Sequence, residues 1–224
     1  MLPALKMLTL YQRSGSAGPD GVLRLAEGLV AGALPALSVL SIDGMHVGEA
    51  GASALAAALD RGALPQLEGL ALYSAAIDDA ALAALAPALR RRPALGYLHL
   101  ERNPFGDDGL AALVAPPPPA GTPPLPAGGL KKLKELFFNG TEITDAGCAA
   151  LVAALESGAL PSLEETDLDG TPAGAAAVEA VHEAMARLRT AQAAVHKEFK
   201  LTDISASDAA IEAVREAMAS SRAA

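Results

Sequence analysis

The segment LPALSVLSI at residues 34–42 recurs along the chain with its leucines at the same positions. It returns 30 residues later as LPQLEGLAL at residues 64–72, and again as LKKLKELFF at residues 130–138. Shorter or degenerate copies occupy residues 2–10, 94–100 and 160–168. Self-similarity at a period of about 20 to 50 residues is typical of proteins built from stacked structural repeats. The sequence therefore predicts a repeat architecture.

Each repeat contains a strand pattern followed by a helix pattern. Leu40 and Ile42 are two residues apart, which places them on one face of a strand and leaves the residue between them on the other. In GASALAAAL at residues 51–59 the leucines are four apart, which is a helical stripe. Helices should end at the glycines of the GALP strings, Gly32, Gly62 and Gly158. Helix starts are expected at the N-cap candidates Asp78, Asp107, Thr144 and Thr171, the last followed by Pro172.

Stacking of these units determines the expected fold. One unit cannot bury its own apolar faces, so successive units must stack into a parallel sheet with a row of helices beside it. A helix is about 10 Å wide and strands lie about 4.8 Å apart, so the stack curves with its strands inside. We expect an α/β solenoid, a curved horseshoe of about six to seven repeats, with strands near residues 7–10, 39–42, 69–72, 97–100, 135–138 and 165–168.

The string LHLERNPFGDDGLAAL at residues 98–113 resembles the ribonuclease-inhibitor-like subfamily of leucine-rich-repeat proteins, and the similarity extends from Leu2 to about Leu168. Repeats of that family usually place Asn or a similar polar residue after each strand. Asn103 is the one expected amide, so we predict an incomplete ladder of side-chain hydrogen bonds and a looser N-terminal half. The corresponding positions are Arg13, Met45, Ala75, Asn103, Thr141 and Thr171.

We expect one solenoid over residues 1–224, interrupted by a proline-rich insertion at residues 116–129. Pro116 should end the preceding helix, and the insertion should be extended polyproline II or disordered. It should be dispensable, because the cost of loop closure rises slowly with loop length. PPLP at residues 123–126 resembles ligands of WW-type domains, and a tolerated loop insertion is the alternative.

Residues 170–224 are expected to form a degenerate C-terminal capping repeat or a helical hairpin. Val178, Val181, Met185 and Leu188 fall at helical spacing and predict a longer helix than the others. In the capping-repeat reading, Val195, Phe199 and Leu201 form a last strand, and Ser205 or Ser207 caps a final helix that ends near Met218. At the other end the chain starts inside a repeat at Met1, so either the first edge strand is exposed or upstream sequence is missing.

Composition restricts the partners and the compartment. No apolar run reaches the roughly 18 residues that a membrane span needs, and the N-terminus lacks the basic-then-apolar order of a signal peptide. The single cysteine, Cys148, cannot form an internal disulfide, which suits the cytoplasm. The net charge of −9 opposes nucleic acid or an anionic membrane as the main partner. We expect a monomer.

Residues that could support catalysis or metal binding are scattered. His182 and Glu183 lack the second histidine of a zinc-protease helix, and the glycine-rich residues 15–21 lack the Lys-Ser/Thr ending of a phosphate-binding loop. Cys148 lies on the inward stripe of its helix and is read as a small buried hydrophobe rather than a nucleophile. Asn139-Gly-Thr141 matches a glycosylation acceptor, a chance match without an export signal. We predict that the protein is not an enzyme and binds no metal or cofactor.

The strand face gives the positive signal. All three tyrosines of the chain fall at outward strand positions, and such side chains recur as interface anchors. Five carboxylates from Glu101 onward would attract a basic protein. Ordinary solvation of a strand face is the alternative reading. The predicted partner-binding residues on the concave face are Tyr11, Asp43, Tyr73, Tyr97, His99, Glu101, Glu135, Phe137, Asn139, Glu165, Asp167 and Asp169.

The resemblance thus implies a protein–protein interaction scaffold that binds a partner through the concave strand face. A first alternative is a GTPase-activating or other regulator of catalysis, because the same repeat type occurs in Ran GTPase-activating proteins. Those proteins carry a long acidic tail, whereas this chain ends in SSRAA at residues 220–224. A second alternative is a leucine-rich-repeat fragment of a larger sensor or signalling protein, which the abrupt start at Met1 favours.

Overall fold

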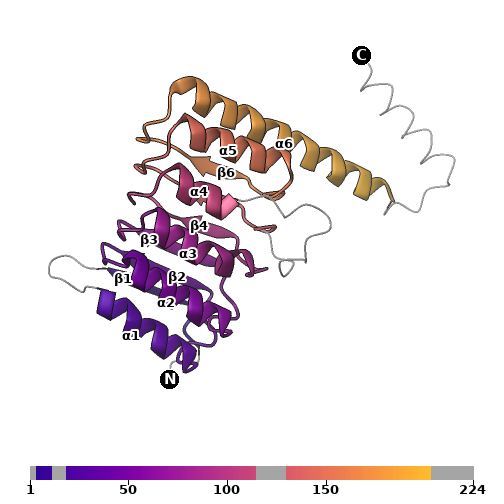
Figure 1. Cartoon of the computed structure of the whole chain (residues 1–224). Coiled ribbons are helices and arrows are strands. Elements are labelled where there is room, and N and C mark those ends of the chain that lie inside the picture. The colour runs from indigo at the N-terminus through magenta and orange to yellow at the C-terminus, as the bar shows by residue number, and fades with distance from the viewer. Residues whose placement is uncertain (1–3, 12–18, 115–129, 203–224) are drawn as a thin grey trace, which may run out of the picture. The chain divides into compact units, whose positions relative to one another are not determined.

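The computed structural model describes residues 4–11, 19–114 and 130–202, in which six strands and six helices alternate along the chain (Figure 1). The strands are β1 (Met7–Tyr11), β2 (Val39–Asp43), β3 (Gly69–Tyr73), β4 (Tyr97–His99), β5 (Glu135–Phe137) and β6 (Glu165–Asp167). The helices are α1 (Pro19–Val30), α2 (Gly48–Asp60), α3 (Asp79–Arg90), α4 (Asp107–Val114), α5 (Asp145–Glu156) and α6 (Ala175–Thr202).

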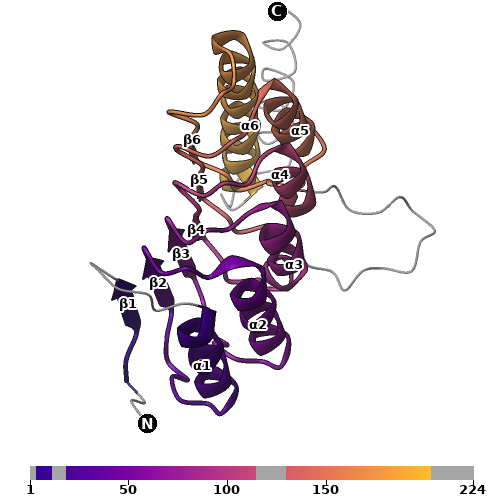
Figure 2. The ribbon, with the colours of Figure 1, turned by 60° about the vertical axis from the view of Figure 1, so that its left-hand side comes forward.

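The strands form a single sheet in the order β1-β2-β3-β4-β5-β6, and every neighbouring pair is parallel. Equivalent repeat positions are in register, so Leu40 pairs with Leu70 and Leu98 with Leu136. Each of α1 to α4 packs against the next helix, and Figure 2 shows α1 to α5 as one layer beside the sheet. The six predicted strands and their single parallel sheet are therefore confirmed.

The core lies between the sheet and the helix layer. Leu70 and Leu72 of β3 are buried, and Leu82, Leu85 and Leu89 of α3 are buried as well. The same alternation and the same helical stripe recur from repeat to repeat, so the core is continuous through the stack. In β6 the third leucine of the pattern is replaced by Thr166, and its hydroxyl donates a hydrogen bond of 2.8 Å to the carbonyl of Leu136.

The glycines of the GALP strings end their helices as expected. Gly32, Gly62 and Gly158 have φ angles of +74°, +88° and +74°, a conformation that glycine adopts without steric cost. Asp78 and Thr144 are confirmed as N-caps, because their side chains accept hydrogen bonds from the N–H groups of residues 81 and 146.

Two expected helix caps are wrong. Asp107 is the first residue of α4, and its carboxylate accepts hydrogen bonds from Thr144 of the next repeat instead of capping its own helix. Thr171 and Pro172 lie outside α6, which begins at Ala175. The Thr171 hydroxyl donates to the carbonyl of Leu168 at 2.8 Å, so it stabilises the turn after β6 rather than the helix.

Asn103 supports the turns of two adjacent repeats. Its side-chain oxygen accepts hydrogen bonds of 2.9 and 3.0 Å from the N–H groups of Ala75 and Ile77. Its amide nitrogen lies 2.6 Å from the carbonyl of Leu72 and 2.8 Å from that of Leu100. At the equivalent position Thr141 makes one such contact, to the carbonyl of residue 138.

The chain divides into two compact units, residues 1–185 and 186–224, and the boundary falls within α6. The predicted last strand at Val195, Phe199 and Leu201 is wrong, because these residues continue α6. No glycine or proline interrupts the sequence from Ala175 to Thr202, so nothing in it favours an end to the helix there. The expected final helix after Ser205 or Ser207, the insertion at residues 116–129 and Arg13 lie outside the described residues.

Candidate functional site

The sheet has one face packed on the helices and one face that the helices α1 to α5 leave uncovered (Figure 2). We call the second face, which carries the alternate strand residues, the open face. Met7, Tyr11 and Tyr97 are its exposed large hydrophobic side chains, with 61%, 59% and 41% of their surfaces accessible. Cross-strand pairing arranges the predicted residues in three rows, namely Tyr11, Asp43 and Tyr73, then Tyr97, Glu135 and Glu165, then His99, Phe137 and Asp167.

A hollow of about 560 Å³ lies on the open face, where strands β2 to β6 end. Six of its eight lining residues belong to the predicted set. The other two, Ser74 and Arg102, come directly after the strand alternation ends and have φ angles of +44° and +55°. Alternation in the sequence does not extend into such turns, so it could not identify them. The lining residues are Asp43, Tyr73, Ser74, Glu101, Arg102, Phe137, Asn139 and Asp167.

Three rings from adjacent strands form an aromatic row beside the hollow. The His99 and Phe137 rings are stacked at 4.6 Å with an interplanar angle of 23°, and Tyr73 meets His99 edge-on at 6.4 Å. Nε2 of His99 lies 3.2 Å from a carboxylate oxygen of Glu135. Rings that pack on one another lose little further freedom when a partner binds, so the row is a preorganised apolar surface.

Glu101 differs from the other predicted residues because it is buried, with 5% of its surface accessible. Its side chain is therefore enclosed by neighbouring residues, although it lines the hollow on the open face. Its carboxylate forms a hydrogen bond with the Tyr73 hydroxyl, while Oε2 has no hydrogen-bond partner within the described structure. A buried carboxylate oxygen without a partner is costly, so Glu101 is the most unusual group of the hollow.

Tyr73 responds to this environment. Burial, the hydrogen bond to Glu101 and the negative charges of Glu101 and Asp43 raise the pKa of Tyr73 to about 12, against the opposing effect of Arg102. The hydroxyl therefore remains protonated at neutral pH and can only donate to the carboxylate or accept from a bound group.

Asp167, at the end of β6, lines the side of the hollow away from Asp43 on β2, and its neighbours hold it in place. Its carboxylate accepts a hydrogen bond from the side-chain amide of Asn139 and another of 2.8 Å from the N–H of Asp169. Glu165 and Asp169 are exposed beside it. Asp167 therefore has a structural role as well as a charge, whereas Glu165 and Asp169 contribute exposed charge alone.

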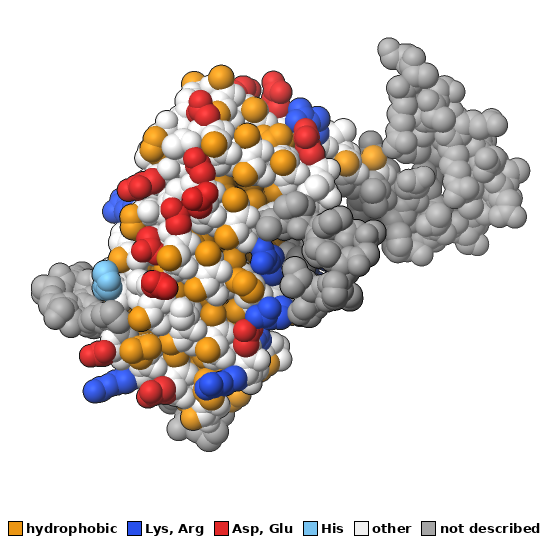
Figure 3. Space-filling model, viewed as in Figure 1, with side chains coloured by type: hydrophobic (Ala, Val, Ile, Leu, Met, Phe, Trp, Pro, Cys, Tyr) orange, Lys and Arg blue, Asp and Glu red, His pale blue; other side chains and the backbone are white. Residues whose placement is uncertain are grey.

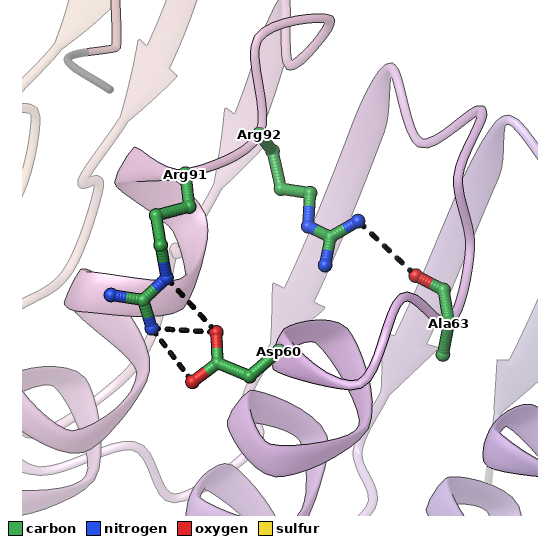
Figure 4. Close-up of polar contacts among 4 residues, drawn as sticks. All are labelled: Asp60, Ala63, Arg91 and Arg92. Atoms are coloured by element: carbon green, nitrogen blue, oxygen red, sulfur yellow. Dashed lines mark hydrogen bonds and ion pairs between the residues drawn. The ribbon is translucent and has the colours of Figure 1, made fainter. Parts of the chain in front are cut away.

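Three arginines at or just after the end of α3 already interact with neighbouring repeats. Arg91 forms an ion pair with Asp60 of the preceding repeat at 2.5 Å, and Arg92 donates to the carbonyl of Ala63 at 3.3 Å (Figure 4). Arg90 donates to the carbonyl of Ala112 at 2.5 Å. These arginines link successive repeats. Figure 3 shows most of the acidic side chains of the visible face along the edge where the helices begin. At helix N-termini, their negative charges interact favourably with the positive ends of the helix dipoles.

Groups that could support other chemistry are not brought together. Among residues 4–11, 19–114 and 130–202, no three His, Cys, Asp or Glu side chains are placed to hold a metal ion. The Cys148 side chain is 1% accessible, and burial raises the pKa of its thiol. Both effects make it a poor nucleophile.

No protein-family model matches the sequence, and no curated protein shows significant similarity to it. In the part of the chain that the structure describes, no helix combines the length and apolar character needed to cross a membrane.

Proposed function

We propose that this chain is a leucine-rich-repeat solenoid that binds another protein through its open face. The sequential order of six parallel strands, each followed by a helix, supports the repeat architecture. So do the sequence period of about 30 residues and the pattern of residues 98–113. We extend the proposal to the cytoplasm as the working compartment, since the fold has one cysteine, Cys148, and needs no disulfide.

The hollow on the open face carries the proposal. It combines an aromatic row, a buried carboxylate and exposed acidic side chains on a surface that the described residues leave uncovered. Interface hot spots favour aromatic anchors in a central pocket with charged residues at the rim. The carboxylates Asp43, Glu101 and Asp167 favour a basic partner.

The helix layer is a weaker candidate for a binding surface. Arg91 and Arg92, its most conspicuous charges, are engaged with Asp60 and Ala63 of the neighbouring repeat. Binding through these arginines would require those contacts to break. Binding at Tyr97 on the open face requires no such rearrangement.

The test compares two equally exposed side chains on opposite layers. Tyr97 on the open face and Val30 on α1 are each 41% accessible. Proteins captured from a lysate by the immobilised parent are identified, purified and titrated calorimetrically against the parent, Tyr97→Ala and Val30→Ala. We expect Tyr97→Ala alone to weaken binding. Equal affinity for all three proteins, or a loss confined to Val30→Ala, would refute the open face as the binding surface.

A further inference from the structure

We infer that the hollow on the open face receives the guanidinium group of an arginine side chain from the bound protein, with Glu101 as its buried counter-charge. The inference rests on the proposed function and specifies which chemical group of a partner occupies the hollow. It is carried by three features of the hollow, which are the unpartnered oxygen of Glu101, an excess of negative charge and an aromatic wall.

The first feature is Glu101 itself. The residue is 95% buried, being 5% accessible, and Oε2 has no hydrogen-bond partner among the described residues. The Tyr73 hydroxyl donates a hydrogen bond to the same carboxylate. A buried carboxylate oxygen is stabilised when a donor reaches it, and a charged donor stabilises it most. Glu101 lines the hollow, so its enclosed carboxylate is an acceptor at the wall of the hollow that the described residues do not fully satisfy.

The second feature is charge. The lining includes three carboxylates, from Asp43, Glu101 and Asp167, and one cation, Arg102. The positive charge of Arg102 is felt at this site, because it opposes the rise in the pKa of Tyr73. The Arg102 side chain is exposed, so an incoming cation can replace it. The remaining negative charge attracts a cationic group and disfavours an acidic one.

The third feature distinguishes guanidinium from other cations. Phe137 and Tyr73 line the hollow with aromatic carbon, and Phe137 is stacked on His99 on the side of β4. A guanidinium pairs with carboxylate in a planar fork and lies against aromatic rings, whereas an ammonium group is a strongly hydrated point charge. The described residues offer no cluster of three ligands for a metal ion. A volume of about 560 Å³ is in the range of ligand pockets and holds a side chain with part of its backbone.

The experiment uses three short peptides of sequence Gly-Gly-X-Gly-Gly with blocked ends, in which X is arginine, lysine or the neutral isostere citrulline. Each peptide is titrated into the ¹⁵N-labelled full chain at low ionic strength, and amide chemical shifts report the dissociation constant. We expect the arginine peptide to shift the amides of Ser74, Arg102 and Asn139, which line the hollow. It should bind at least fivefold tighter than the lysine peptide, and the citrulline peptide should not saturate.

Two substitutions in the hollow should change the affinity in opposite directions. Glu101→Gln keeps the shape of the side chain and removes its charge, so it should weaken binding of the arginine peptide at least fivefold. Arg102→Ala removes the internal competitor, so it should strengthen binding severalfold, and its exposed position makes a folding defect unexpected. Glu49→Gln, the same chemical change in the first turn of α2, is the matched control and should leave binding unchanged.

The outcomes separate this inference from the proposed function. Equal binding of the arginine and citrulline peptides, or indifference to both Glu101→Gln and Arg102→Ala, overturns the guanidinium pocket. Equal binding of arginine and lysine overturns the preference for a guanidinium. If the captured protein loses affinity with Tyr97→Ala while the arginine peptide fails to bind, the proposed function stands and this inference falls. If the peptide behaves as expected and the affinity of the captured protein is unchanged by Tyr97→Ala, the hollow binds a guanidinium, but the open face at Tyr97 is refuted as the surface that the captured protein uses.

Discussion

The carboxylate of Asp107, the first residue of α4, accepts hydrogen bonds of 2.8 Å from the N–H of Thr144 and 2.6 Å from its hydroxyl. Thr144 is the N-cap of α5, so a side chain of one repeat holds the helix start of the next. Asp79 makes the equivalent contacts to Gly106 and Gly109, and Asp145 does so to Gly174. The three carboxylates form a ladder that couples repeats at the edge where the helices begin.

Removing one step of this ladder should destabilise the fold. Asp107→Ala takes two hydrogen bonds from Thr144, and hydrogen bonds to charged groups contribute about 2 kcal/mol each when well shielded. Because the site is partly exposed, we expect a total loss of about 2 kcal/mol, measured by urea unfolding. Asp108→Ala, at the exposed neighbouring position, is the control and should cost clearly less. An equal loss for both variants would mean that general helix-dipole effects explain the ladder.

The Asp107 carboxylate of this ladder also explains why residue 147 is a glycine. A Cβ on Gly147 would collide with Oδ1 of Asp107 and lie 2.8 Å from Cγ2 of Ile143, whereas a Cβ on Gly28 of α1 would meet nothing within 4 Å. Both glycines lie in helices, where alanine is intrinsically favoured by about 1 kcal/mol. Gly28→Ala should therefore raise the melting temperature and Gly147→Ala should lower it. A rise in both variants would show that the Asp107 side chain moves aside without cost.

The buried amide of Asn103 should be more important than the threonine that replaces it in the next repeat. Asn103→Ala leaves the N–H groups of Ala75 and Ile77 and nearby carbonyls without partners. We expect a loss of about 3 kcal/mol, since unsatisfied buried groups cost about 1 to 3 kcal/mol each. Thr141→Ala removes one contact and should cost about 1 kcal/mol. Chemical denaturation of both variants measures the difference, and similar losses would contradict the dominant role of Asn103.

Ionisation of Tyr73 gives a pH dependence. Its pKa in the folded chain is about 12 and the ordinary pKa of tyrosine is 10.0, so the folded state holds the proton more tightly. This contribution to stability is complete below pH 10 and is lost as the pH rises towards 12. The phenolate absorbance of the parent minus that of Tyr73→Phe should show a midpoint near pH 12 while circular dichroism reports a folded chain. A midpoint near 10 in the folded chain would contradict the contact with Glu101.

Binding of a basic partner should depend differently on anchors and on rim charges. Tyr97→Ala removes an exposed anchor and should cost about 2 kcal/mol of affinity with little change in fold stability. Glu165→Lys with Asp169→Lys should mainly slow association, and this effect should shrink once the Debye length falls below about 8 Å with added salt. We choose this pair over Asp167 because Asp167 also holds Asn139. Association kinetics with the purified partner separate the two effects, and unchanged rates for the charge-reversed protein would exclude electrostatic steering.

The sequence alone determined the strands, their sheet and the ends of several helices. These features depend on local rules, because a period of two places Leu70 and Leu72 on one face and a glycine such as Gly62 ends a helix wherever it occurs. Repetition of the pattern then leaves one economical way to bury the leucines, which is to stack the units in order. The exposure of Tyr11, Tyr97 and Glu165 on the open face followed from the same alternation.

Only the tertiary structure decided what happens where the alternation stops. Glu101 becomes buried, and Ser74 and Arg102 enter the hollow, because left-handed turns after β3 and β4 redirect the chain. Asp107 bonds to Thr144 rather than to its own helix because stacking brings residues 37 positions apart into contact. Such contacts depend on how one repeat is placed against the next, and no pattern within a single repeat specifies that placement.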